Sequence, residues 1–456
     1  MIVERLARLV GGRIMFFALA YAGGAAVQKG LGFVLFMWFA GTLSVDDYAR
    51  FGLLYALQTG VAALALAGII ETTIGGLKNA GDDAGQRALL RSANVVFLVT
   101  AGLAVFAVPT AFSWSGTYGW PAIVGAAVSG ALTAFFILQA QLARIVERHG
   151  VALLLGFLPG LIGLLGGLGG FLTEPSPRAF FVGSTCGLVA SLPLVAFARL
   201  GFADSFLRDV GARRILLTMG PFVLVALVDW FLGYGSTYLT KAFFANEVVA
   251  RFVFAYTLSS IMHLVATSLN QAWSPRVYRM IHSQPLATVE RGNRRFHALQ
   301  GLILGTVGAA LLIAVPIAVA MIPSMAAYRN LQIESLILFA IYACVIPWYH
   351  AQNYYYAHEQ GPVLMRISIV TSLTGVALWI AAASVLGPIG AYVGLLLMTL
   401  AKVTGGVFWA RRTWGIWILW QGPVIALMLL LLGTWASVAL TPFAVETLLD
   451  NFGRSH

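Results

Sequence analysis

The sequence predicts an all-α polytopic membrane protein, and its composition and hydropathy pattern are the observations that predict it. Of the 456 residues, 60% are hydrophobic and only 10% are charged, whereas a soluble domain carries about 25% charged residues. The hydrophobic residues gather in about thirteen stretches, and ~20 apolar residues allow a helix to cross a bilayer. Backbone groups in lipid must be satisfied within the segment, so we expect helices; the ~10-residue alternation of a transmembrane barrel is absent.

The predicted spans follow one another along the chain. They lie at about 14–40, 51–74, 92–112, 119–143, 150–172, 179–198, 218–244, 248–271, 297–322, 332–356, 362–386, 387–409 and 416–440. The basic segment 1–13 resembles the start of a signal peptide, but the apolar stretch behind it is too long for one, so we expect a retained first span. Both cysteines, Cys186 and Cys344, lie within predicted spans and indicate no disulfide framework.

The basic residues assign an orientation to these spans. If the N-terminus is cytoplasmic, twenty of the 28 Lys and Arg residues fall in inside segments, while Lys29 and Lys402 fall within spans. The outside segments hold six, namely Arg50, Arg178, Lys241, Arg251, Arg329 and Arg454. This asymmetry satisfies the positive-inside rule and predicts a multi-pass protein of a bacterial inner membrane. Topology and anionic lipid headgroups then account for the net charge of +11, and we expect no nucleic-acid partner.

An internal repeat divides the chain into two halves. Residues 46–57, DDYARFGLLYAL, align with residues 247–258, EVVARFVFAYTL, at an offset of 201 residues, with Ala, Arg, Phe, Tyr and Leu in common. Each copy opens the second of six spans, so the two halves have the same orientation, as in a parallel repeat. We therefore expect an N-terminal lobe, a cytoplasmic linker, a second lobe, and an additional span with a tail, at 1–200, 201–217, 218–410 and 411–456.

The two longest loops, at about 199–217 and 272–296, both face the predicted cytoplasmic side. The first has the composition of an amphipathic surface helix that joins the two halves. The second carries the cluster Arg291, Arg294 and Arg295. We expect no soluble domain in the chain.

Several of these features together resemble one family of transporters. A long first span precedes LSVDDYARFGLL (43–54), which is similar to the pattern Leu-Ser-x-x-x-Tyr-x-x-Phe/Tyr-Gly, and NEVVARFVFAYTL (246–258) repeats it. The eighth span ends with a proline, Pro275, in NQAWSPRVY. Over roughly residues 1–410 this looks like the polysaccharide-synthesis flippases, the Wzx-type translocases of O-antigen or lipid-linked oligosaccharide, whose superfamily also holds multidrug-and-toxin extruders and lipid II flippases. The thirteenth span departs from the twelve usual in the family.

The resemblance implies a fold, a cargo and partners. The implied fold has two six-helix lobes around a central cavity that works by alternating access. The implied cargo is an undecaprenyl-pyrophosphate-linked oligosaccharide, moved from the cytoplasmic to the outer leaflet. Besides membrane lipids, a polysaccharide polymerase and chain-length regulators are the partners that such a flippase implies.

Lys29 is the strongest candidate for a cargo contact. It lies midway along the first span, in GGAAVQKGLG, where a charge is costly and usually faces a cavity or a partner. A buried lysine can pair with a pyrophosphate as a compact point charge. The alternative is a structural ion pair with an internal carboxylate.

Asp229 lies midway along the seventh span and aligns with Gln28 by the repeat offset. We expect Gln28 and Asp229 to present polar groups at matching depths. Asp229 has three possible roles: a partner of Lys29, a proton or sodium site, and a contact for sugar hydroxyls. A buried carboxylate is suited to proton coupling because burial favours its protonated form.

Five further positions each have two possible roles. Glu71 is either interfacial or an ion-coupling group, and His263 is either a core residue or a proton relay. Lys402 either reaches the cytoplasmic face or lines the cavity. The repeat-matched pair Arg50 and Arg251 either anchors the ends of spans or binds anionic groups at the exit.

Two segments are distinguished by composition. WYHAQNYYYAHEQ (348–360) either contacts sugars or, as we favour, forms an interfacial aromatic belt. The glycines of residues 156–170 suit the fifth span to close packing, and Pro159 suits it to a kink.

The motifs also limit the function. None of the four lysines follows a glycine, so no phosphate-binding loop and no ATP motor is present, and no metal-binding CxxC or HExxH spacing occurs. We therefore expect a transporter without a cofactor that is coupled to an ion or cargo gradient. The leading hypothesis is the flippase and the second is a multidrug or small-molecule cation antiporter. An embedded enzyme is disfavoured because the predicted outer loops are short.

Overall fold

The computed structural model describes most of the chain, and the described part is helical. It describes residues 13–70, 72–73, 83–113, 119–145, 148–198, 215–216, 219–220, 223, 225–228, 230–231, 233–358 and 360–453. Among these residues, eleven candidate membrane spans are long and apolar enough to cross a bilayer. Each coincides with one predicted span, and no strand occurs in these ranges. The predicted all-α polytopic fold is confirmed.

The chain forms two compact units. Unit 1 consists of Met1–Leu35 and Arg50–Tyr238, and unit 2 of Phe36–Ala49 and Leu239–His456. The predicted lobe boundaries stay a prediction, and the predicted linker lies mostly outside the described residues.

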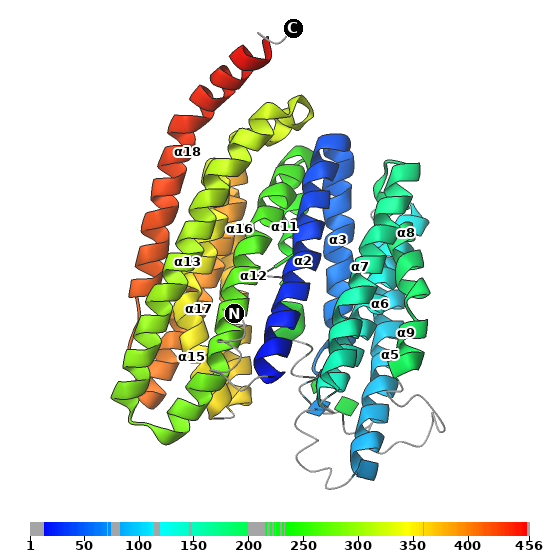
Figure 1. Cartoon of the computed structure of the whole chain (residues 1–456), viewed down its shortest axis with the longest axis vertical. Helices are drawn as coiled ribbons and strands as arrows, with labels where there is room; N and C mark the ends of the chain where they lie inside the picture. The colour runs from blue at the N-terminus through cyan, green and yellow to red at the C-terminus, as the bar shows by residue number, and fades with distance from the viewer. Residues whose placement is uncertain are drawn as a thin grey trace. The chain divides into compact units, whose positions relative to one another are not determined.

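Unit 1 contains the larger part of the first helix and the helices that follow it (Figure 1). α2 (Arg13–Thr42) ends in unit 2, and α3 (Val45–Leu66) begins there. The other helices of unit 1 are α5 (Asp83–Ser113), α6 (Trp120–Ile145), α7 (His149–Thr173), α8 (Pro177–Ala190) and α9 (Pro193–Ala198). α7 and α8 form a tight antiparallel hairpin whose backbones meet at glycines, including Gly166 against Gly183. The predicted close packing of the fifth span is therefore confirmed.

Unit 2 is built around two helix pairs. Its helices are α11 (Ser236–Phe243, which begins in unit 1), α12 (Asn246–Ser283), α13 (Leu286–Met321), η1 (Pro323–Tyr328), α14 (Gln332–Cys344), α15 (Ile346–Ala357), α16 (Gly361–Leu386), α17 (Pro388–Trp414) and α18 (Gln421–Gly453). α13 lies along α18, and α16 lies along α17 (Figure 1). α14 and α15 are one predicted span divided at Val345, just before Pro347, because proline cannot donate the helical hydrogen bond.

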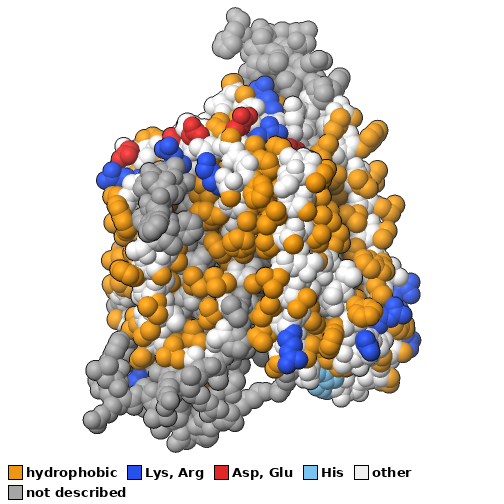
Figure 2. Space-filling view, turned by 180° about the vertical axis from the view of Figure 1, so that it is seen from behind, with side chains coloured by type: hydrophobic (Ala, Val, Ile, Leu, Met, Phe, Trp, Pro, Cys, Tyr) orange, Lys and Arg blue, Asp and Glu red, His pale blue; other side chains and the backbone are white. Residues whose placement is uncertain are grey.

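The surface agrees with a bilayer environment. On the face shown in Figure 2, hydrophobic side chains cover most of the area between the helix ends, and Lys, Arg, Asp and Glu gather near those ends. Leu103, Phe106, Val385 and Trp435 are each more than 60% exposed. Large apolar side chains exposed in such numbers require an apolar solvent.

The internal repeat is visible in the packing of α3 and α12. α12 begins 201 residues after α3, the offset that the sequence predicts. In α3, the ring of Phe51 stacks on Tyr55 with centroids 6.4 Å apart. In α12, Phe252 stacks on Tyr256 in the same way, at 5.9 Å. The two copies thus share local geometry as well as sequence.

Each of these helices also makes an equivalent contact with the last span of its half. Phe51 packs against Phe181 near the start of α8, with centroids 5.6 Å apart. Phe252 packs against Tyr392 near the start of α17, at 5.3 Å. The repeat therefore extends to tertiary packing within each unit.

One expected loop is largely helical. We expected an extended connection at 272–296, but α12 continues to Ser283 and α13 begins at Leu286, so the prediction of a long loop is wrong. Only Gln284 and Pro285 connect the two helices. The arginine cluster that suggested a loop occupies the first turns of α13, and several of its polar neighbours are buried.

Candidate functional site

Part of the predicted cargo site lies outside the described residues. Asp229 and Glu71 are outside them, as is the side chain of Lys29. The backbone at position 29 lies in α2, thirteen residues before the end of that helix at Thr42, or ~20 Å at 1.5 Å per residue. Gln28 lies against Gly160 of α7, within unit 1. A Cβ atom added at Gly30 or Gly32 would meet no atom within 4 Å, so this part of α2 borders open space.

The remaining predicted site residues have the following places. Lys402 of α17 lies 5.4 Å from the ring centroid of Trp348. Arg251 forms an ion pair with Glu334 of α14 at 3.2 Å, so its guanidinium already holds a carboxylate. Arg50 is exposed in the second turn of α3. His263 is exposed and lies 5.6 Å from the ring of Tyr342. Their roles in transport stay predictions.

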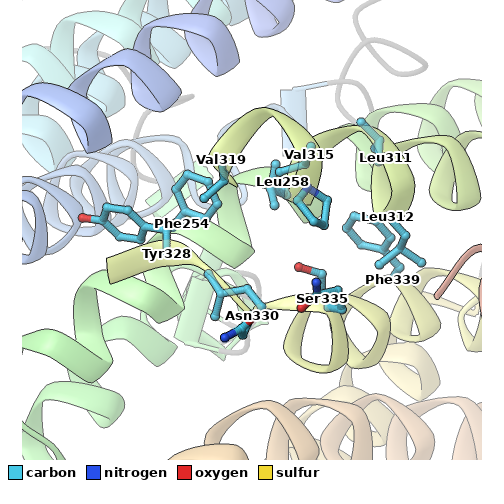
Figure 3. Close-up of a pocket in the computed structure, with 13 residues that line it drawn as sticks. Phe254, Leu258, Leu311, Leu312, Val315, Val319, Tyr328, Asn330, Ser335 and Phe339 are labelled. Atoms are coloured by element: carbon cyan, nitrogen blue, oxygen red, sulfur yellow. The ribbon is translucent and has the colours of Figure 1, made fainter. Parts of the chain in front are cut away.

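Unit 2 contains a pocket between α12, α13, η1 and α14. Figure 3 shows side chains of α13, such as Leu312 and Val315, near Phe254 and Phe339 across this space. Its empty volume is about 320 Å³, part of which is open to solvent. No charged side chain lines it, so it is not suited to a pyrophosphate. Burial raises the pKa of Tyr328 at its edge, which keeps the phenol neutral.

The most developed polar site in unit 2 is centred on Glu290. Among the described residues, Glu290 is the one Asp, Glu, Lys or Arg whose side chain is fully buried. Tyr354 donates a hydrogen bond to its Oε1 at 2.6 Å, and the backbone N–H of Trp417 donates to its Oε2 at 2.9 Å. Nε2 of His350 lies 3.1 Å from the same Oε2. An ionised carboxylate only accepts hydrogen bonds, so three donors fit the ionised form.

Glu290 begins a polar stripe on α13. Asn293, His297 and Gln300 follow at positions i+3, i+7 and i+10, and all four side chains are at most 2% exposed. This spacing puts them on one face of the helix. Nδ2 of Asn293, Nδ1 of His297 and Oε1 of Gln300 have no hydrogen-bond partner among the described residues. Buried polar atoms of this kind are usually satisfied by ordered water when protein groups do not reach them.

A second row of polar groups lies on α15. His350, Tyr354 and His358 are spaced by four residues, so they share a face. His350 and Tyr354 are buried, whereas His358 at the end of the helix is exposed. Burial, together with the neighbouring His282, lowers the pKa of His358. We name the stripe on α13 and this row on α15 the polar core; they meet at Glu290.

Amide and hydroxyl groups of α12 and α15 extend the network. Oγ of Ser274 donates to Oδ1 of Asn353 at 2.8 Å, and Nδ2 of Asn353 donates to Oδ1 of Asn270 at 3.3 Å. Trp273 donates to Oδ1 of Asn293 at 2.9 Å. These bonds tie α12 to both α13 and α15.

The polar core was not predicted from the sequence. The stripe on α13 lay inside the segment interpreted as a loop, although Glu290, Asn293, His297 and Gln300 already had helical spacing. The favoured aromatic belt at 348–360 is also wrong for most of that segment. Trp348, His350, Asn353, Tyr354 and Tyr355 are each at most 4% exposed, so they face protein and not the interface.

The fold is that of known transporters. A structure of a lipid II flippase, MurJ, in an inward closed conformation aligns with a TM-score of 0.66 and 12% identity, covering 96% of this chain and 99% of the flippase. A multidrug resistance MATE family transporter of the MOP superfamily aligns in its inward-facing conformation with a TM-score of 0.62 and 14% identity, covering 87% of this chain and 98% of the transporter. Its outward-facing conformation gives 0.64 and 14%, with 88% and 95% covered.

These alignments decide the architecture. The chain has the MATE and MurJ fold. No protein-family model matches the sequence, and no curated protein matches it. At 12–14% identity the similarity establishes the fold alone. Membership of the Wzx-type flippases stays a prediction.

Proposed function

We propose that this protein is a flippase that moves an undecaprenyl-pyrophosphate-linked oligosaccharide from the cytoplasmic to the outer leaflet by alternating access. The observation that carries the proposal is Lys29, in the middle of an unbroken membrane-length helix of a transporter fold. Its Cα lies ~20 Å from the end of α2, at 1.5 Å per residue. A charge at that depth usually faces a cavity or a partner.

The cargo follows from the sign of that charge. A pyrophosphate is anionic, and a lysine can neutralise part of its charge as a hydrated point cation. The sign of the charge on Lys29 is therefore the feature that favours a lipid-linked anion as cargo.

The roles of the residues are proposed as follows. Lys29 attracts the pyrophosphate into a cavity open to the cytoplasm, while the prenyl chain stays in lipid. Asp229 and Gln28 contact the sugars or the head group from matching positions in the repeat. Movement of the two lobes relative to one another then exposes the head group to the outer side. Asp229 or Glu71 takes up a proton that resets the cycle.

The test is crossing of an undecaprenyl-pyrophosphate-linked oligosaccharide in proteoliposomes that contain the full chain. Lys29→Ala should reduce the rate to that of empty liposomes, and Lys29→Arg should keep part of it. Lys78→Ala is the matched control, because the sequence places Lys78 in a cytoplasmic segment; it should cross at the wild-type rate. Wild-type crossing by Lys29→Ala would overturn the role of Lys29.

The second candidate is a multidrug or small-molecule cation antiporter, because MATE multidrug transporters share the fold. In the same liposomes, efflux of an organic cation driven by an opposing ion gradient distinguishes the two. Cation efflux without any glycan crossing would replace the flippase with the antiporter. Glycan crossing without cation efflux would remove the antiporter.

A further inference from the structure

The polar core of unit 2 has the properties of a site that gains and loses one proton. Oε2 of Glu290 faces Nε2 of His350 at 3.1 Å, so Nε2 must carry a hydrogen for the contact to be a hydrogen bond to an ionised carboxylate. The titrating atom of the pair is therefore the other ring nitrogen, Nδ1 of His350. That atom is buried and has no partner among the described residues.

The two protonation states of this pair have different net charge. With Nδ1 unprotonated, the buried site carries the full negative charge of Glu290. With Nδ1 protonated, imidazolium and carboxylate neutralise each other, but a buried N–H then needs an acceptor. Burial penalises both the uncompensated charge and the unpaired donor. Because each protonation state carries a penalty, a change in the surroundings or hydration of the pair can shift the equilibrium between the two states.

The stripe on α13 provides further buried polar atoms that could bind water beside His350. The ring of His297 lies edge-on to that of His350, with centroids 5.4 Å apart, and its Nδ1 also lacks a partner among the described residues. Oε1 of Gln300, one turn further along α13, is an unpaired acceptor in the same ranges. A water molecule between these atoms would satisfy them and would give the proton on His350 an acceptor.

The row on α15 leads from the site to the surface. The ring of Tyr354 lies 5.4 Å from that of His350 and 6.4 Å from that of His358. His358 is exposed and lies 6.0 Å from His282 at the end of α12. The exposed end is the one that the basic residues predict to be cytoplasmic. Tyr354 and His358 can therefore exchange a proton between the site and that side.

Among the described residues, His350 is the group that forms an ion pair with Glu290, and the other elements around the site carry the following groups. α12 contributes His282, and Arg276, which lies over the ring of Trp273. α17 contributes Lys402, which lies over Trp348. The segment after α17 contributes the backbone N–H of Trp417. No group of three or more His, Cys, Asp and Glu side chains in the described ranges is placed to hold a metal ion, so the donor set fits a proton.

We propose that Glu290 and His350 form a proton-binding site in unit 2, reached through the row on α15 and hydrated along the stripe on α13, and that its occupancy is coupled to transport. The coupling rests on the proposed function, whereas proton binding does not. In the binding step, the lone pair of Nδ1 takes up a proton from water, no other bond breaks, and the net charge of the pair goes from −1 to zero.

Proton binding is tested without any cargo. The full chain with ¹⁵N-labelled histidine rings is placed in nanodiscs, and the signal of His350 is assigned from its loss in His350→Gln. In the wild type we expect that signal to change with pH as Nδ1 gains and loses its proton. Glu290→Gln should lower its midpoint by about two pH units, because the carboxylate no longer stabilises the imidazolium. The control Glu334→Gln should leave it unchanged.

Tyr354→Phe is a second variant that keeps the buried charges. It removes one donor to the carboxylate, so the anionic state loses stability and the midpoint should rise by about one pH unit. An unchanged midpoint in either Glu290→Gln or Tyr354→Phe would overturn the site. A His350 signal that does not change with pH would also overturn the site.

Coupling is tested in the liposome assay with and without a pH gradient. The glycan should cross wild-type liposomes at least tenfold faster with the gradient than without it, whereas Glu290→Gln should give the same rate with and without the gradient. An acceleration retained by Glu290→Gln would overturn the coupling. If no glycan crosses in the wild type, the flippase fails, while the titration of His350 still decides the site.

Discussion

In both halves, buried polar side chains connect the third span to the fourth, but the two halves use different polar groups. In unit 1, Asn94 of α5 accepts a hydrogen bond from Gln139 of α6 at 2.5 Å, and both are buried. In unit 2, α13 and α15 are joined by Glu290 with His350 and Tyr354. A neutral amide pair holds two helices together at any pH, whereas a buried carboxylate and an imidazole add a charge that can change. The two copies therefore share an apolar scaffold, and the proton-binding site that we propose belongs to one of them.

The largest expected difference between the two regions is in stability. Glu290→Ala leaves the hydroxyl of Tyr354, the backbone N–H of Trp417 and Nε2 of His350 without their acceptor. We expect a loss of about 3–5 kcal/mol in the free energy of unfolding. Asn94→Ala removes one neutral hydrogen bond and should cost about 1–2 kcal/mol. Reversible denaturant unfolding of both purified variants measures this, and equal losses would remove the distinction between the two regions.

The scaffold that the halves share should respond equally. Phe51 and Phe252 are each at most 1% exposed and make repeat-related contacts. Phe51→Ala and Phe252→Ala should each cost about 3 kcal/mol, mainly through the cavity that each leaves. Phe106→Ala is the control, because Phe106 is 74% exposed and should cost little. Unequal losses, measured by the same unfolding experiment, would show that the packing of the two copies is not equivalent.

The α7–α8 hairpin of unit 1 allows a sharper test with adjacent residues. A Cβ at Gly170 would collide with the carbonyl oxygen of Ala179, while one at Gly169 would meet nothing within 4 Å. Gly170→Ala should therefore destabilise the protein by about 1–3 kcal/mol. Gly169→Ala should be neutral or stabilising by up to about 1 kcal/mol, because alanine favours the helix.

The matching hairpin in unit 2 extends this test. Gly390 meets the carbonyl oxygen of Ala382, whereas Gly361 has open space around it. The same pattern of loss is expected for Gly390→Ala and Gly361→Ala. Similar losses for Gly170→Ala and Gly169→Ala would contradict the close approach of the helices in unit 1.

The scaffold was predictable from sequence because its signals are local. Apolar length predicts a membrane span without knowledge of its neighbours, and the repeat places Phe51 and Phe252 at equivalent positions. The glycines of residues 156–170 predict close packing because only small residues let helix backbones approach. Each of these inferences needs one segment, or two segments of similar sequence.

The polar core was harder to predict because its partners are far apart in the chain. Glu290 contacts His350, which lies 60 residues later in the chain. Nothing in the sequence of either segment indicates this partner. The arginines beside Glu290 made the segment look solvated, since long basic side chains can leave a helix on one face while polar groups are buried on the other. The helical spacing of Asn293, His297 and Gln300 was the available signal, and the expected loop concealed it.

The smallest expected effect concerns the ion pair of Arg251, which the repeat matches with Arg50. The pair with Glu334 is partly exposed, with 29% and 17% of the two side chains accessible. Solvent screens such a pair, so the coupling energy between the two charges should be only about 0.2–1 kcal/mol. A double-mutant cycle with Arg251→Gln, Glu334→Gln and the double variant measures it in the unfolding experiment.

Arg412→Gln combined with Glu334→Gln is the reference cycle and should give no coupling, because Arg412 is exposed near the end of α17, ~30 Å along that helix from Tyr392, which contacts Phe252 beside Arg251. A coupling above about 2 kcal/mol for Arg251 and Glu334 would require a desolvated pair. Unit 2 would then contain a second strong electrostatic site besides Glu290. The difference in polar chemistry between the two units would then depend on both sites.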